Sequence, residues 1–214
     1  MTQEKNTLKS FHFISLLVLI ICFITIKNIP AQQLDTTKTI IMFGNSITHQ
    51  GNWEEVLNRK DIVNWGIPGY TTQQLSWTIK DVLRLYKPKI CFIEGGINDF
   101  TLGINTERIY QNQIMVMDSL AHNKVFPVYQ TTLYQLHNDK VNRAIDVLNF
   151  LMQKYCKQRG YGFIDISSAL SKEGDIIPEI TIDGTHLKPD GYVLWGKEVQ
   201  KYLNENKRYY LLNR

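Results

Sequence analysis

The stretch Thr39-Ile-Ile-Met-Phe-Gly44 decides the fold class. An apolar run that ends at a glycine is typical of a buried strand entering a turn. Similar runs predict further strands at 61–64, 89–93, 125–131 and 163–166. Segments with helical spacing of their apolar residues separate the strands, at 53–59, 72–85, 106–122, 139–159 and 189–203. This alternation predicts an α/β protein whose parallel sheet is covered by helices on both faces.

The composition is that of a globular chain. Of the 214 residues, 43% are hydrophobic and 21% are charged, which suits one folded domain and excludes a disordered tail protein. The 24 Lys and Arg residues against 20 Asp and Glu residues give a net charge of +4. So small an excess argues against nucleic acid or an anionic membrane as a partner.

The N-terminal segment has the layout of an export signal. Lys5 and Lys9 precede an apolar run at 11–26, and Ala31 follows a proline. This order predicts a signal peptide, 1–31, that is cleaved after Ala31. The alternative is an uncleaved N-terminal membrane anchor, because Ile29 fits only loosely the small residue expected two positions before Ala31.

The folded domain is therefore expected at 32–214, in an exported protein of the periplasm, cell envelope or extracellular space. Any membrane contact would be made through the N-terminal segment if it stays uncleaved. This domain keeps two cysteines, Cys91 and Cys156, outside any Cys-x-x-Cys pattern or Cys/His cluster. We expect two buried free thiols rather than a disulfide or a zinc site.

Polar and small residues follow the predicted strands, where parallel sheets place their ligands. Ser46 supplies a hydroxyl nucleophile, His186 a base able to take its proton, and Asp183 a carboxylate to orient that base. The N–H groups of Ser46 and Gly66 and the amide of Asn98 are candidate donors to an oxyanion. Each residue alone has an ordinary structural explanation, as a cap, a turn or a surface histidine. Their joint placement predicts an acyl-transfer site.

Four segments carry a family resemblance, and they cover essentially the whole domain: Gly44-Asn-Ser-Ile-Thr48, Asn64-Trp-Gly-Ile-Pro-Gly69, Gly95-Gly-Ile-Asn-Asp99 and Asp183-Gly-Thr-His-Leu187. In this order they resemble the sequence blocks of the SGNH hydrolases, or GDSL-like lipases and acylhydrolases. The resemblance implies a flavodoxin-like, three-layer α/β/α fold with a five-stranded parallel sheet. It implies the same roles for the site residues named above, and neither a metal nor an organic cofactor. The family's usual aspartate before the serine is Asn45 here, which puts the local hydrogen bonding of that turn in question.

These features predict a serine esterase that removes short acyl groups, such as acetyl, from a glycan or a similar small ester. The alternative is a short-chain lipid esterase, resembling lysophospholipases or platelet-activating-factor acetylhydrolases. A non-catalytic binding module and a flavin or nucleotide binder are weaker alternatives, since the site set is complete and no Walker-type loop is present. Five aromatic residues near the strand ends could form a sugar or acyl platform, or could serve as core and rim packing: Trp53, Tyr70, Trp77, Tyr129 and Tyr134.

Overall fold

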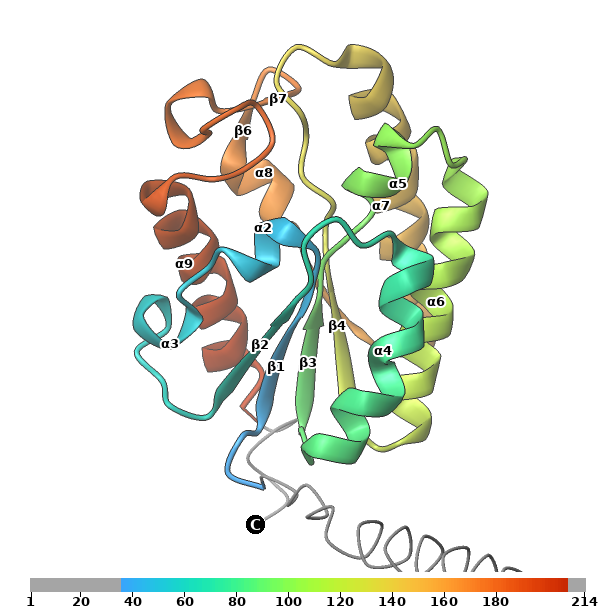
Figure 1. The fold of residues 1–214 in the computed structure, drawn as a ribbon, viewed down its shortest axis with the longest axis vertical. Helices are drawn as coiled ribbons and strands as arrows, with labels where there is room; N and C mark the ends of the chain where they lie inside the picture. The colour runs from blue at the N-terminus through green and yellow to red at the C-terminus, as the bar shows by residue number, and fades with distance from the viewer. Residues whose placement is uncertain (1–35, 208–214) are drawn as a thin grey trace, which may run out of the picture. The chain divides into compact units, whose positions relative to one another are not determined.

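The computed structural model describes residues 36–207 (Figure 1). The expected signal or anchor at 1–31 lies outside these residues, so both interpretations of it stay predictions. Within 36–207, no helix combines the length and the apolar character that crossing a membrane requires.

The central sheet has five strands, all paired in parallel. They are β1 (Ile40–Gly44), β2 (Ile62–Gly66), β3 (Ile90–Ile93), β4 (Phe126–Gln130) and β5 (Gly162–Ile164). Their spatial order is β2-β1-β3-β4-β5, with every neighbouring pair parallel. This is the strand order of flavodoxin-like sheets, and it confirms the fold expected from the sequence.

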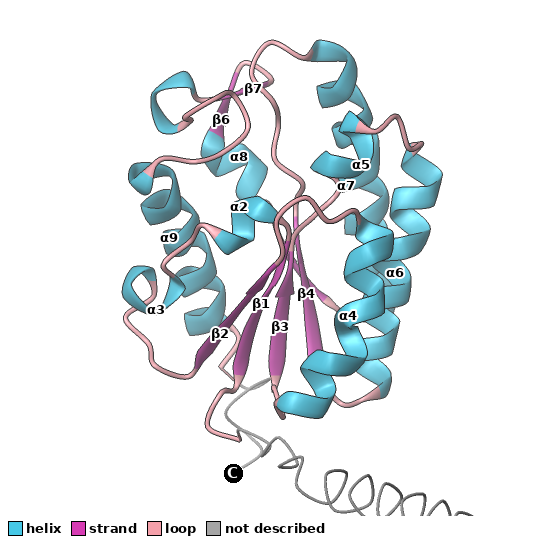
Figure 2. Ribbon diagram, in the orientation of Figure 1, coloured by secondary structure: helices cyan, strands magenta, loops and turns pink. Residues whose placement is uncertain are grey.

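Helices cover both faces of the sheet and make three layers (Figure 2). One face carries α4 (Thr72–Leu85), α6 (Thr106–His122) and α7 (Asp139–Arg159). The other carries α2 (Ser46–His49), α3 (Trp53–Val56), α8 (Ile166–Leu170) and α9 (Pro189–Glu205). The long helices end at the residues that the apolar spacing predicts, except that α9 extends to Glu205.

Alternation along the strands divides the core between these two faces. On β1, Ile40 and Met42 pack toward α2 and α9, whereas Ile41 and Phe43 pack toward α4 and α6. Successive side chains of a strand point to opposite faces, so a strand covered on both sides is apolar throughout. Cys91 and Cys156 are buried free thiols, as the sequence predicted.

Short elements connect the main ones and escape sequence-based prediction. They are α5 (Ile97–Thr101), the hairpin strands β6 (Ser171–Lys172) and β7 (Asp175–Ile176), and the 3₁₀ turn η1 (Pro178–Ile180). The region 167–185 contains most of α8, the hairpin and this turn. These elements have two to five residues and lie outside the regular alternation of apolar runs and helical segments, so no spacing of apolar residues reveals them.

Candidate active site

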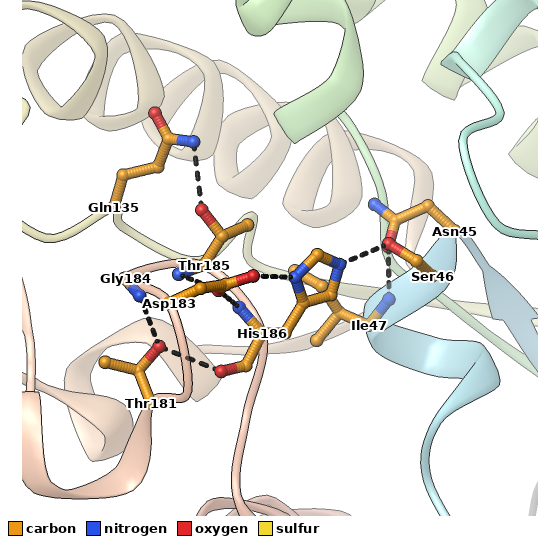
Figure 3. Close-up of polar contacts among 9 residues, drawn as sticks. All are labelled: Asn45, Ser46, Ile47, Gln135, Thr181, Asp183, Gly184, Thr185 and His186. Atoms are coloured by element: carbon orange, nitrogen blue, oxygen red, sulfur yellow. Dashed lines mark hydrogen bonds and ion pairs between the residues drawn. The ribbon is translucent and has the colours of Figure 1, made fainter.

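A serine and a distant aspartate–histidine pair form a hydrogen-bonded chain at the carboxyl end of the sheet (Figure 3). Ser46 is the first residue of α2, directly after β1, and its Oγ lies 2.9 Å from His186 Nε2. His186 Nδ1 lies 2.7 Å from Asp183 Oδ2. The structure thus brings together the serine, histidine and aspartate that the sequence proposed.

The turn that carries Ser46 is fixed by its own residues. The side chain of Asn45 caps α2, with its Oδ1 accepting from Ile47 N–H at 2.8 Å. An aspartate would accept the same hydrogen bond, so asparagine in place of the family's usual aspartate at position 45 preserves the helix cap. Position 44 must be glycine because its neighbours leave no room for a side chain. A Cβ there would lie 2.2 Å from Thr48 Oγ1 and 2.6 Å from the Glu94 carbonyl oxygen.

Buried hydrogen bonds from distant elements hold α2 in place. Trp53 Nε1 donates to the Thr48 carbonyl at 2.8 Å, and the Tyr192 hydroxyl donates to the Ile47 carbonyl at 2.7 Å. Thr48 Oγ1 in turn donates to Glu94 Oε2 at 3.4 Å. These bonds tie the short helix to α3, α9 and the end of β3, so the position of Ser46 depends on the core.

The loop that carries Asp183 and His186 closes on itself. Ile182 N–H and the Thr181 hydroxyl both donate to the His186 carbonyl at 2.8 Å. Thr181 Oγ1 also accepts from Gly184 N–H at 3.0 Å. Because Gly184 has a left-handed φ of +87°, the chain can turn sharply between the aspartate and the histidine.

Asp183 is held as a carboxylate by the groups around it. Partial burial acts to raise its pKa, but donors to the carboxylate outweigh burial and lower the pKa to about 2. These donors include the N–H groups of His186 at 2.8 Å and Thr185 at 3.0 Å, both on Oδ1. An ionised Oδ2 accepts from His186 Nδ1–H, which leaves Nε2 free to accept the Ser46 proton.

The expected oxyanion donors have different surroundings. Asn98, on α5, donates one Nδ2 hydrogen to the Tyr70 carbonyl at 2.9 Å, which orients its amide. Among the described residues, Ser46 N–H has no hydrogen-bond partner. Gly66 N–H, by contrast, donates to Asn64 Oδ1 at 3.0 Å.

The assignment of Gly66 as an oxyanion donor is therefore corrected, because its N–H is already engaged. A Cβ at Gly66 would lie 2.2 Å from the backbone nitrogen of His49, so packing, and not room for a substrate, requires glycine there. Gly69 takes its place as the candidate. Its N–H has no hydrogen-bond partner within 36–207, and the next residue, Tyr70, is the one that Asn98 holds.

Gly69 also has the backbone freedom that a substrate-facing turn needs. Its φ is +78°, and no atom lies within 4 Å of the position where a Cβ would stand. The sequence signal for this residue is the Pro68-Gly69 pair, which marks a tight turn after β2. The two glycines are three residues apart, and the sequence pattern alone does not distinguish them.

Of the two roles that the sequence left open for the aromatic residues near the strand ends, Trp53 and Tyr129 take the packing role. Trp53 and Tyr129 are fully buried, with Trp53 packed edge-on against Tyr192 and Trp195. Trp77 is exposed but lines a cavity between α4 and α6 with residues such as Gln73 and Arg108. Large aromatics near strand ends fill the space between sheet and helices, so position along the chain does not reveal a binding surface.

The side chains of the described residues offer no obvious metal site. Within 36–207, no three His, Cys, Asp or Glu side chains gather closely enough to hold a metal ion. The polar groups at the site are a hydroxyl, an imidazole, a carboxylate, an amide and backbone N–H groups. This set can carry out acyl transfer by nucleophilic attack.

Comparison with known proteins places this site in a family. The model of the GDSL-like lipase/acylhydrolase family matches residues 42–194, so the chain belongs to that family.

Known proteins share the fold and part of the sequence. A GDSL-like lipase from Bacteroides thetaiotaomicron is 21% identical, with a TM-score of 0.70 over 86% of this chain and 96% of that one. A variant of an acetyl-xylooligosaccharide esterase from a Geobacillus species is 16% identical, with a TM-score of 0.66 over 80% of this chain and 95% of that one. Curated relatives from Streptococcus agalactiae named N-acylneuraminate cytidylyltransferase are 31% identical over 117 residues, which is 54% of this chain. The matched segment spans only 28% of the length of those relatives.

Proposed function

We propose that the protein is an exported serine esterase that forms an acyl-enzyme at Ser46. The observation that carries this proposal is the continuous chain of hydrogen bonds from Ser46 Oγ through His186 to Asp183. A serine hydroxyl is a weak nucleophile until a base accepts its proton, and the imidazole is already within hydrogen-bond distance. A binding module without chemistry would have no need of this alignment.

Acylation follows from the geometry. Ser46 Oγ attacks the ester carbonyl carbon as its proton passes to His186 Nε2, and the ionised Asp183 stabilises the resulting imidazolium. The carbonyl oxygen becomes an oxyanion, which the N–H groups of Ser46 and Gly69 and the Asn98 amide stabilise. The bond to the leaving alkoxide then breaks, and the imidazolium returns the proton to that oxygen.

Deacylation repeats these steps with water. The water oxygen attacks the acyl carbon while His186 Nε2 takes one of its protons, and a second oxyanion forms at the same donors. Collapse breaks the bond to Ser46 Oγ, which recovers its proton from the imidazolium. The products are a carboxylic acid and the free enzyme.

The substrate class that we propose is a short acyl ester, such as an acetyl group, on a glycan. The side chains of Asp183 and His186 are 53% and 29% exposed, so the base lies at the surface, within reach of a bulky sugar. Two similar proteins are named for sugars, one for acetyl-xylooligosaccharides and the other for N-acylneuraminate. Export would expose the enzyme to such substrates outside the cytoplasm.

A short-chain lipid ester is the second candidate, favoured by the family's own description as lipase/acylhydrolase. A panel of acetylated sugars, p-nitrophenyl esters of increasing chain length and lysophospholipids separates the two. Higher kcat/KM on acetylated sugars supports the first candidate, and higher kcat/KM on lysophospholipids supports the second. Export is tested separately by N-terminal sequencing of the secreted protein, which should begin at Gln32; a start at Met1 would contradict cleavage.

Hydrolysis of p-nitrophenyl acetate by wild type and Ser46→Ala tests the mechanism. We expect Ser46→Ala to lower kcat by about a millionfold, since removal of the nucleophile of a triad has an effect of that order. Activity should also fall as the pH is lowered from 7 to 5, because only neutral imidazole accepts the serine proton. Asp183, with its pKa lowered to about 2, remains ionised throughout that range. Full activity of Ser46→Ala, or a flat pH profile, would overturn the proposed mechanism.

A further inference from the structure

Glu94 is a fully buried carboxyl group directly beneath the turn that carries Ser46. It follows β3, and the alternation of that strand directs its side chain to the face where α2 and α9 pack, as it does that of Phe92. Its Oε2 accepts the Thr48 hydroxyl, and its Oε1 has no hydrogen-bond partner among the described residues. No Lys, Arg or His within 36–207 forms an ion pair with it.

Backbone contacts place Glu94 against the same turn. Its N–H donates to the Phe43 carbonyl at 2.9 Å, and its carbonyl oxygen lies 2.6 Å from the position that a Cβ on Gly44 would take. Phe43 and Gly44 lead directly into Asn45 and Ser46. Thr48, which the side chain contacts, lies two residues beyond Ser46 in the same helix. Glu94 therefore touches the turn both before and after the serine.

The surroundings of Glu94 favour the protonated acid. Burial raises its pKa to about 8, and the Thr48 hydrogen bond offsets only part of that rise. The titratable groups that interact with it electrostatically are Tyr129 on β4 and Tyr192 on α9. Burial raises the pKa of both hydroxyls, so they stay neutral wherever Glu94 titrates. A carboxylate here would face no compensating charge.

A negative charge at this place would also oppose the reaction. The oxyanion forms next to Ser46, and a carboxylate beneath the turn would repel it through a medium that screens poorly. A neutral acid avoids this repulsion and still accepts the hydrogen bond from Thr48. The buried site thus allows Glu94 to support the turn without a charge.

We propose that Glu94 is a positioning residue for Ser46, which holds the nucleophile turn through Thr48 as a neutral acid and lowers the rate of acyl transfer when it ionises. The inference rests on the proposed function, because it assumes that Ser46 is the nucleophile. It assigns to Glu94 no contact with the substrate. Glu94 acts on Ser46 through its hydrogen bond with Thr48 and through the charge of its own carboxyl group beneath the turn.

Three variants test this role on p-nitrophenyl acetate: Glu94→Gln, Glu94→Leu and Thr48→Val. Glu94→Gln is neutral, has nearly the same shape and retains an oxygen acceptor, so we expect kcat at pH 7 within about threefold of wild type. Glu94→Leu and Thr48→Val lose the contact, and we expect kcat to fall by about tenfold while KM changes by less than about twofold. Rates are normalised to the folded fraction from near-ultraviolet circular dichroism.

The pH profile supplies a measurement that a merely structural role would leave unchanged. Between pH 7 and pH 9.5, after subtraction of spontaneous hydrolysis, wild-type kcat should fall as Glu94 ionises, and Glu94→Gln should lose this fall. Equal alkaline profiles for the two proteins would overturn the inference, as would a Glu94→Gln variant that is folded but inactive. If Glu94→Leu does not fold, the kcat of Thr48→Val and the alkaline pH profile of Glu94→Gln still test the inference. Activity remaining in Ser46→Ala would instead overturn the proposed function.

Discussion

The two halves of the site are held in place by different means. The Ser46 half is anchored in the hydrophobic core. Buried Asn45 caps α2, and Trp53 on α3 and Tyr192 on α9 donate hydrogen bonds to its carbonyl groups. The Asp183–His186 half is a surface loop whose hydrogen bonds run mostly within residues 181–187. Ile182 in this loop is 65% exposed, whereas Ile47 next to the serine is completely buried.

This difference indicates that the nucleophile and the base have different positional requirements. A nucleophile anchored in the core keeps its position relative to the oxyanion donors, which come from the ends of neighbouring strands. The base and its carboxylate need only keep their relation to each other and reach the serine. A local network of donors to one carboxylate can hold that relation without a buried environment. Substitutions in the two halves should therefore have different effects on stability and on rate.

Of the substitutions that compare the two halves, Asp183→Asn in the loop half is expected to have the largest effect on kcat. The substituted side chain keeps an oxygen for the two backbone N–H groups but presents an amide to His186 Nδ1. Because an amide N–H cannot accept a proton from Nδ1, the imidazole is driven to the tautomer that protonates Nε2. We expect kcat on p-nitrophenyl acetate to fall by about a thousandfold or more, with the melting temperature nearly unchanged.

A matched control for this variant is Asp175→Asn, which removes a carboxylate charge 3.4 Å from the exposed His137 and keeps the oxygen that accepts from Asn142 Nδ2. It should keep kcat within about threefold of wild type, as surface ion pairs contribute little. Comparable losses in the two variants would mean that Asp183 acts through overall charge and not through the tautomer of His186.

A smaller loss of kcat is expected from Asn98→Ala, which changes one of the oxyanion donors that act beside Ser46. Removal of one side-chain donor to an oxyanion lowers kcat by about a hundredfold to a thousandfold, with a lesser change in KM. The control is Asn64→Ala, whose amide holds the His49 and Gly51 carbonyls and whose Oδ1 accepts Gly66 N–H. We expect that control to keep kcat within about fivefold. A loss in Asn64→Ala as large as in Asn98→Ala would contradict the assignment of Gly69 in place of Gly66.

The sequence predicts the fold better than it predicts the details of the site. Apolar runs that end in glycine give the strands, and the order of the four family-like segments places Ser46, Asn98, Asp183 and His186. The choice between Gly66 and Gly69 depends on where one N–H points, and a sequence pattern carries no such information. Glu94 escapes notice because a single acidic residue after an apolar strand ordinarily indicates the start of a loop. Its burial results from the packing of α2 and α9, which lie far from it in the sequence.

The smallest effects are expected when one buried hydroxyl is removed from each half of the site. Thr181→Val removes the hydroxyl that donates to the His186 carbonyl and accepts from Gly184 N–H. Tyr192→Phe removes the hydroxyl that donates to the Ile47 carbonyl. Both substitutions nearly preserve shape, so thermal unfolding and kcat can be compared directly.

The two variants should differ in rate more than in stability. Thr181→Val leaves Gly184 N–H without its acceptor, and Tyr192→Phe leaves the buried Ile47 carbonyl without the Tyr192 hydroxyl, so each should lower the free energy of unfolding by about 1–2 kcal/mol. Thr181→Val should also lower kcat by about tenfold, because the Thr181 hydroxyl joins the His186 carbonyl to Gly184 N–H across the turn that carries the base. Tyr192→Phe should keep kcat within about threefold, because Trp53 and Glu94 still hold α2. Equal losses of kcat would mean that the core does not anchor the nucleophile more firmly than the loop holds the base.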